Sequence, residues 1–455
     1  MINHVKFKDE TLWRLSKKYN VARFLSFDPN LKLRYAKISE TDREVSGSLR
    51  AVISNLLELC DSVNIRTFLP SQASGNPFVY GLTSADLVLE KMYEFSKLGY
   101  FCLVNETISI NDGGVSGVVD QGIVEFSPDD TPRAVEKPGV CALSFDLANH
   151  ILSTVYEIRN PIPFQKNQRV EFSLHPNRVG VRNEQVLVWE STPSQLHEDY
   201  IVVPNWPNNF SRHIGDKVFG LLIADAIGLA VPHGTVVGRR IAPFIFGQPT
   251  VSHETWIRTC PTVQEPGKYT TTKSWLDPFA LMHDEDPENT NIQALIFQNG
   301  VHAEYSGATL SSNGKTIIEG IAGTGEAFMS GSKSPEPLPT KIIDEVEEVL
   351  MLAETRIGAP VRIEWVHDGK QVWIVQMHII SSPFIEQGKL KNEQILEWVD
   401  FDPESGIAEL NRLIEIAKGN RSGIRVTRPT GITSHVGDLL RKNSIPFILA
   451  AVKDL

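Results

Sequence analysis

Apolar residues near the start of the chain recur three or four positions apart, as on the buried face of a helix. Thr41 and Glu44 come just before this run and form a candidate capping box. The pattern predicts that residues 1–62 are helical. A second helix is predicted over residues 84–98, with Gly99 as its stop signal. The apolar positions of the first run are Val45, Leu49, Val52, Ile53, Leu56 and Leu57.

Short runs rich in β-branched and aromatic residues follow, and they predict strands. These segments are YFCLVNETISI, GIVEF, RVEFSLHP and QVLVWE. The portion up to residue 203 is therefore predicted to mix helices and strands. No motif in this portion indicates a catalytic site.

The segment PNWPNN, from Pro204 to Asn209, has the composition of a linker. Beyond it, helical patterns cover residues 216–228, 340–356 and 388–420, and the last 35 residues return to turn-and-strand character. The segments VRIEWVHDG and KQVWIVQMHII meet at an Asp-Gly turn, which is a hairpin signal. Further strands are predicted for HGTVVGRRI, QALIFQNG, AEYSGATLSS and TIIEGIAG.

These patterns predict an α/β (α+β) protein built from three parts. Residues 1–203 form a mixed α/β N-terminal domain of unknown role. Residues 204–385 form the central domain, and residues 386–455 form a helical linker followed by a small C-terminal segment.

Composition narrows the class of protein. The 455 residues include 44 Lys and Arg against 55 Asp and Glu, a net charge of −11, so non-specific nucleic-acid binding is not expected. No apolar run approaches the ~20 residues that span a bilayer, and the N-terminus lacks the apolar core of a signal peptide. The four cysteines lie too far apart for a CxxC metal site or a disulfide scaffold. We expect a cytoplasmic protein without a membrane partner, and a homo-oligomer stays open.

Two segments of the central part suit a phosphate site. Lys217 lies in IGDKVFG at a helix start, where backbone N–H groups and a lysine can meet a phosphate. Arg258 follows a strand-like pair in WIRT and can bind a phosphate through two hydrogen bonds. The glycine-containing loop PGKYTT, which includes Gly267 and Lys268, could close over phosphates. Taken alone, an exposed lysine and a surface arginine are the more common explanations of the first two, and a plain turn explains the loop.

Two further segments offer oxygen ligands. IEGIAGTGE contains three glycines and the carboxylates of Glu319 and Glu326. Glu364 and Gln376 lie twelve residues apart on the two arms of the predicted hairpin, so the turn places them roughly opposite each other. Two oxygen ligands on one face suit Mg²⁺ bound to a nucleotide. A cross-strand polar pair without a metal explains the same spacing.

Taken in order, these segments resemble the nucleotide-binding domain of phosphoenolpyruvate synthase and pyruvate phosphate dikinase. IGDKVFGLLIADAIGLAVPHGTVV is similar to that family's GGKGANLAEL…GLPVPPGFVI, and WIRT is similar to its VRSS. FQNGVHAEYSGATLSS, IIEGIAGTGEAFMSGSKSPE and VRIEWVHDGKQVWIVQ resemble three further segments of it. The likeness covers residues 215–380, and GITSHVGDLLRKNSIP at 431–446 resembles the family's phosphohistidine segment.

The resemblance implies an ATP-grasp-like fold that binds ATP with Mg²⁺. By motif position, Lys217 and Arg258 contact the phosphates, Glu364 and Gln376 hold the metal, and His435 carries the phosphoryl group. A neutral imidazole suits this role because it is nucleophilic near pH 7. The other nucleotide-binding residues that the resemblance implies are Gly267, Lys268, Gln298, Glu319, Gly323, Gly325, Glu326 and His378.

The sequence departs from the family at two positions beside the metal pair. Arg362 stands where the family has an aspartate, and His378 stands where it has an arginine. No pyruvate-binding barrel follows within the sequence, so complete synthesis of phosphoenolpyruvate is not expected.

Three functions remain open at this point. The leading hypothesis is an enzyme, a dikinase-like phosphotransferase dependent on ATP and Mg²⁺. It would pass a phosphoryl group through His435, or directly, to an unknown acceptor. The second is a degenerate nucleotide sensor or assembly subunit without turnover. The third is one chain of a split enzyme whose partner chain carries the missing domains.

Overall fold

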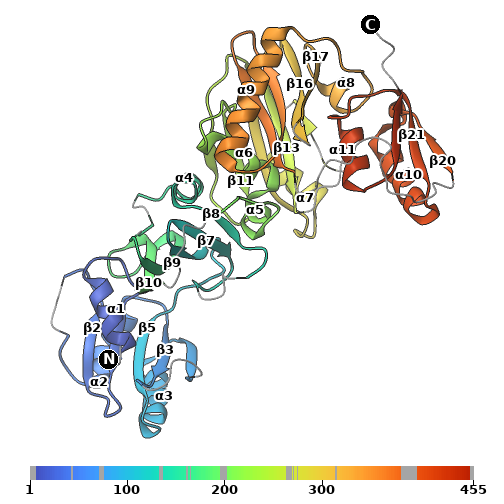
Figure 1. Ribbon diagram of the computed structural model, residues 1–455. Helices are drawn as coiled ribbons and strands as arrows, with labels where there is room; N and C mark the ends of the chain where they lie inside the picture. The colour runs from blue at the N-terminus through green and yellow to red at the C-terminus, as the bar shows by residue number, and fades with distance from the viewer. Residues whose placement is uncertain are drawn as a thin grey trace. The chain divides into compact units, whose positions relative to one another are not determined.

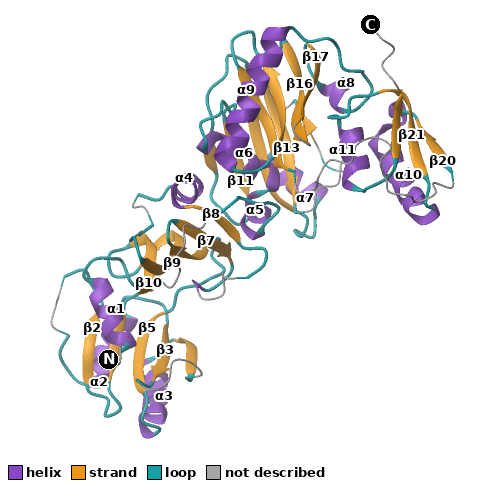
Figure 2. Ribbon diagram, in the orientation of Figure 1, coloured by secondary structure: helices purple, strands orange, loops and turns teal. Residues whose placement is uncertain are grey.

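The computed structural model divides into two compact units, Met1–Val202 and Val203–Leu455. Helices and strands are interspersed along both (Figures 1 and 2). The mixed α/β class predicted from the sequence is confirmed, and the sheets are mostly antiparallel. The structure describes residues 7–41, 45–70, 76–132, 137–159, 162–163, 165–194, 202–262, 269, 271–273, 275–312, 315–380 and 397–450.

The first unit contains two five-stranded sheets, in the orders β2-β1-β5-β3-β4 and β10-β9-β6-β7-β8. The apolar faces of two helices, α2 and α3, pack against the first sheet and form its core. The helices are α1 (Lys8–Ser16), α2 (Leu49–Leu57), α3 (Ala85–Lys97) and α4 (Phe145–Tyr156). The strands are β1 (Phe24–Phe27), β2 (Leu33–Lys37), β3 (Val63–Phe68), β4 (Phe78–Leu82), β5 (Phe101–Glu106), β6 (Val115–Asp120), β7 (Ile123–Pro128), β8 (Cys141–Ser144), β9 (Gln168–Val179) and β10 (Glu184–Pro193).

The prediction that residues 1–62 are helical throughout is wrong. Between α1 and α2 the chain forms the hairpin β1–β2, in which Phe24 pairs with Lys37. All four residues of β1 are buried, so the strand lacks the alternating pattern that distinguishes a strand from a helix. The helix predicted after Thr41 begins only at Leu49, where the Ser48 side chain accepts a hydrogen bond from Ala51 N. Glu44, of the proposed capping box, lies outside the described residues.

The second unit contains two antiparallel sheets, ordered β12-β11-β15-β13-β14 and β17-β16-β18-β19, and a parallel three-stranded sheet, β20-β21-β22. Its helices are α5 (Asn209–Ile214), α6 (Asp216–Ala226), α7 (Pro278–Glu285), α8 (Glu326–Met329), α9 (Thr340–Ile357), α10 (Gly406–Asn420) and α11 (His435–Lys442), with a 3₁₀ turn at Pro403–Ser405. Its strands are β11 (Gly234–Gly238), β12 (Phe244–Phe246), β13 (Thr255–Pro261), β14 (Thr271–Thr272), β15 (Ile292–Asn299), β16 (Tyr305–Ser312), β17 (Lys315–Ala322), β18 (Val361–His367), β19 (Val372–Ile379), β20 (Trp398–Phe401), β21 (Gly423–Pro429) and β22 (Phe447–Ala450).

The strand pair β18–β19 forms the hairpin predicted from the Asp-Gly signal. Gly369 has φ +87°, a left-handed conformation that favours glycine. The Asp368 carboxylate accepts backbone hydrogen bonds from Lys370 and Gln371 and closes the turn. The turn sets the register from His367–Val372 to Trp365–Ile374, and a register shift between Glu364 and Trp365 then places Glu364 opposite Gln376.

Close contact joins α6 to β19. A Cβ atom on Gly220, in the middle of α6, would lie 2.1 Å from the Met377 carbonyl oxygen. Only glycine allows this approach, so the helix rests directly on the strand backbone.

The C-terminal part differs from the prediction in two ways. The last 35 residues were predicted to be turns and strands, but α11 lies among them, capped by Ser434. The helical pattern predicted over 388–420 holds for α10, whereas residues 398–401 form the strand β20. Both differences come from short segments whose structure depends on the parallel sheet: β20 is one of its strands, and the apolar residues of α11 pack in its core. Among the described residues, no helix is long and apolar enough to cross a membrane.

Candidate active site

Strand register places several predicted residues in one line across the four-stranded sheet. Ala308 of β16 pairs with Glu319 on one side and with Glu364 on the other, and Glu364 pairs with Gln376. Residues that pair in this way lie on the same face of a sheet. The adjacent line on that face contains Arg362, which pairs with His378. Ala308, which lies between Glu319 and Glu364 in this line, has only a short side chain.

Helix α6 brings Lys217 to this region. The residue before the helix, Gly215, has φ +97°, and a Cβ atom there would lie 2.4 Å from the Cβ atom of Cys260. The start of α6 is thereby held against β13. Burial, with the nearby charge of Arg258, lowers the pKa of Lys217, and the carboxylate of Glu364 acts in the opposite direction. Lys217 has no hydrogen-bond partner among the described residues.

Strand β13 contributes Arg258 from the other antiparallel sheet. Its Nη1 donates a hydrogen bond to the Val375 carbonyl of β19 at 3.1 Å, which joins the two sheets. Its Nε is buried and has no partner within the described chain. Burial lowers the pKa of Arg258, against the opposite effect of Glu364. A cation in such a position carries a desolvation cost that an anion would offset.

Glu364 is the anionic centre of the cluster. Its Oε1 accepts a hydrogen bond from Arg362 Nη1 at 2.9 Å, and both side chains are buried. Burial raises the pKa of Glu364, but Arg362 and the other cationic groups outweigh this effect and lower it to about 2. Glu364 is therefore ionised at neutral pH, and its charge is matched by Arg362. Among the described residues, Lys217 and Arg258 have no hydrogen-bonded carboxylate.

Helix α11 brings His435 to the same cluster. Burial, together with Arg362, lowers the pKa of His435, although Glu364 acts in the opposite direction. His435 therefore has a neutral imidazole with a free electron pair at neutral pH. Its segment is tied to the sheet at Thr433, whose N–H and hydroxyl both donate to Glu319 Oε2 at 2.8 Å. The Thr433 carbonyl accepts from Arg362 Nη2 at 2.8 Å.

Gln376 and His378 interact with each other on β19. The Gln376 amide nitrogen and His378 Nε2 lie 2.5 Å apart. Burial, with the charges of Lys442 and Arg362, lowers the pKa of His378 to about 3. His378 is therefore neutral and does not supply the positive charge of the arginine that the resembled family has there.

The predicted metal pair carries a fixed cation in this arrangement. Arg362 donates to Glu364 Oε1 and the amide nitrogen of Gln376 is engaged with His378, which leaves one oxygen atom of each predicted ligand. Oxygen-ligated cations need several such donors. Within the described ranges, no group of three or more His, Cys, Asp or Glu side chains could hold a metal ion.

The remaining predicted residues lie in other surroundings. Gln298 is buried on β15, in register with Trp256 of β13, and its Nε2 has no partner among the described residues. The carboxylate of Glu326 lies at 3.4 Å from Lys273. Gly323 donates its N–H to the Glu304 carbonyl, and Gly325 packs against Ser306. No contact joins these glycines or Glu326 to Glu364 in the described chain. Gly267 and Lys268 lie outside the described residues.

The sequence reasoning missed two contributions to the cluster. Arg362 stands out only as a departure from the family, whereas the structure gives it the central ion pair. Asp438 lies one turn after His435 on α11, and its carboxylate is 2.8 Å from Lys442. The spacing of His435, Asp438 and Lys442 places them on one helical face, a signal that could have identified Asp438.

No family model and no curated protein matches this chain. Among solved structures, 37% of it aligns with the D-alanine-D-alanine ligase from Coxiella burnetii, at 11% identity and a TM-score of 0.26. A D-alanine–D-alanine ligase from Bacillus anthracis complexed with ATP aligns over 36% of the chain, at 12% identity and a TM-score of 0.25. The aligned parts cover 47% and 54% of those chains, so this chain spans about half their length. Likenesses this slight carry no conclusion about activity.

Proposed function

We propose that residues 204–385 form an ATP-grasp-like nucleotide-binding domain and that the chain is an ATP-dependent phosphotransferase. One observation carries the proposal. Lys217 and Arg258 converge on Glu364, whose charge is already matched by Arg362. The polyphosphate of a nucleotide would supply the missing negative charge.

The family resemblance adds to this observation. Motifs separated by more than two hundred residues in the sequence, from Lys217 to His435, meet in one cluster. Convergence of this kind is what a site requires and what unrelated short matches do not produce.

The proposed reaction uses His435 as the phosphoryl carrier. A ring nitrogen attacks a phosphorus atom of the bound nucleotide, so an N–P bond forms as a P–O bond breaks. The leaving phosphate takes the electron pair, and Lys217 and Arg258 stabilise its charge. The phosphoryl group then passes to an acceptor that the chain does not identify. Magnesium chelated by the nucleotide, as the resemblance implies, would lower the charge of the polyphosphate.

The test is incubation of the full chain with Mg²⁺ and ATP labelled separately at the β and γ phosphates. We expect acid-labile, base-stable label on the protein, with AMP or ADP released. His435→Ala should abolish the label and keep nucleotide binding. His283→Ala, an exposed histidine of α7, is the matched control and should keep both. Label that persists on the His435→Ala protein contradicts the carrier assignment.

A second candidate function is a nucleotide sensor or subunit without turnover. The observation that favours it is the engagement of Glu364 by Arg362 in place of a free carboxylate. This function predicts that ATP raises the melting temperature without consumption. ATP consumption that disappears in Glu364→Ala removes it. Co-purification with a second polypeptide that restores transfer would favour the split enzyme.

A further inference from the structure

The ion pair between Arg362 and Glu364 is buried. Only 6% of Arg362 and 8% of Glu364 are exposed. The two residues are separated by one position on β18, so both project from the same face. A buried ion pair is shielded from water and from exchange with ions in solution.

Arg362 also bonds beyond Glu364. Its Nη2 donates to the Thr433 carbonyl, two residues before His435. Its third nitrogen, Nε, is buried and has no partner among the described residues. One guanidinium thus binds the carboxylate, holds the histidine segment and keeps a donor for a further oxygen atom.

We propose that Arg362 takes the place of a divalent cation at Glu364. The site then binds its phosphate ligand through three side-chain cations, Lys217, Arg258 and Arg362, with no ion held by Glu364 and Gln376. A guanidinium has a permanent charge and several donors, so it can neutralise a carboxylate and a phosphate oxygen together. A dication at the same carboxylate would meet the charge of Arg362 at short range. The part of this inference that concerns phosphate rests on the proposed function.

The first experiment uses Mn²⁺ alone, followed by the paramagnetic resonance signal of the free ion. We expect the wild-type chain to bind no Mn²⁺ at this site. Arg362→Asp places a third oxygen ligand beside Glu364 and Gln376 and should create one Mn²⁺ site. Adding Glu364→Gln to that variant should remove it. One-to-one binding of Mn²⁺ by the wild type that Glu364→Gln abolishes overturns the inference.

The second experiment measures ATP binding by calorimetry, in EDTA and in Mg²⁺. We expect wild-type affinities within about threefold of each other, since a tenfold change is worth ~1.4 kcal/mol. Arg362→Gln should weaken binding in EDTA by about tenfold or more, and Arg362→Lys should restore part of it. A wild type that binds ATP a hundredfold more tightly with Mg²⁺ overturns the inference. If neither buffer supports ATP binding, the proposed function fails, and the Mn²⁺ result still decides the role of Arg362.

Discussion

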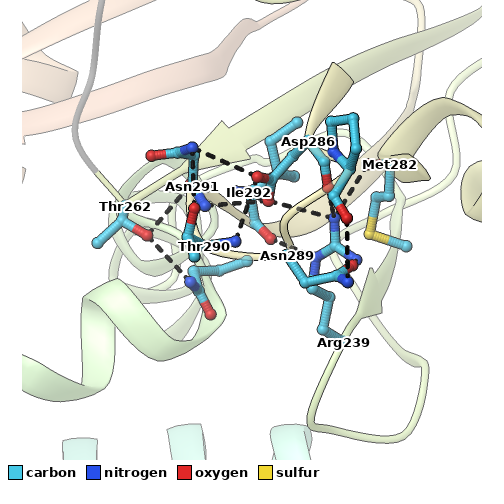
Figure 3. A network of polar contacts seen from close by, with 10 residues as sticks. Arg239, Thr262, Met282, Asp286, Asn289, Thr290, Asn291 and Ile292 are labelled. Atoms are coloured by element: carbon cyan, nitrogen blue, oxygen red, sulfur yellow. Dashed lines mark hydrogen bonds and ion pairs between the residues drawn. The ribbon is translucent and has the colours of Figure 1, made fainter. Parts of the chain in front are cut away.

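Two arginine–carboxylate clusters in the second unit differ in how completely their polar atoms are paired. In the first, Figure 3 shows Arg239 and Asp286 in a closed network. Arg239 donates to the carbonyls of Ile292 and Met282 at 2.7 and 3.0 Å, as well as to Asp286 and to the Asn289 side chain. Asp286 accepts from the backbone N–H groups of Thr290, Asn291 and Ile292.

The second cluster, around Glu364, is open. Arg258 makes one bond, to a carbonyl, and leaves its buried Nε unpaired within the described chain. The Nε atom of Arg362 is also buried and has no hydrogen-bond partner in the described chain. Both clusters contain an ion pair between an arginine and a carboxylate, so the ion pair alone does not distinguish them. A closed network stabilises the fold, whereas an open one has donors available for a ligand.

The largest expected effect is on the closed network. Asp286→Ala leaves Arg239 without its carboxylate and three backbone N–H groups without an acceptor. We expect a loss of about 3–5 kcal/mol in the free energy of unfolding, measured by urea titration. Asp284→Ala, an exposed aspartate two residues earlier, is the control and should stay within about 0.5 kcal/mol of wild type. Equal effects of the two substitutions would remove the contrast.

An intermediate effect on stability is expected when the pH is lowered, because the open cluster contains buried histidines. Burial lowers the pKa of His378 to about 3, so this histidine stays neutral in the fold, while the unfolded chain takes up a proton below about 6.5. Its contribution to stability is therefore present above pH 6.5 and is lost as the pH falls toward 3. His435, whose pKa burial also lowers, acts in the same direction.

Melting temperatures measured between pH 6.5 and 5.5 check this expectation. The window lies above the range in which Glu364, with its pKa lowered from 4.5 to about 2, loses its stabilising effect. We expect a decrease of roughly 1.5–3 °C per pH unit for each proton that the unfolded chain takes up alone. His378→Gln should make the slope shallower. A slope unchanged by this substitution would show that other histidines cause it.

The smallest effect on stability is expected from Arg258→Met. The substitution removes a poorly paired buried cation and keeps apolar contacts, so unfolding free energy should change by about 1 kcal/mol or less. Arg239→Met, the same substitution in the closed network, should cost about 3 kcal/mol or more. ATP affinity should respond in the opposite order, with a loss only in Arg258→Met. Similar costs in unfolding for both variants would mean that the site around Arg258 is structural.

Local sequence patterns were enough to predict much of the fold. The Asp-Gly turn and the twelve-residue spacing were enough to predict the hairpin and to bring Glu364 and Gln376 roughly opposite each other, whereas their pairing also depends on a register shift between Glu364 and Trp365 that no sequence signal predicted. The strand β1 was missed because complete burial erases its alternating pattern. The role of Arg362 was missed for another reason. Its second bond goes to the backbone of Thr433, 71 residues away, and a carbonyl has no signature in a sequence.

The close contact at Gly220 between α6 and β19 also determines which part of the site can move. With α6 resting on the backbone of β19, Lys217 is expected to travel with Gln376 and His378 as one rigid body. His435 belongs to helix α11, which packs on the parallel sheet and is joined to this body by the hydrogen bonds of Thr433. Under the proposed function, entry and exit of a nucleotide are expected to depend on displacement of the histidine segment. The rate of that displacement would set an upper limit on the proposed turnover.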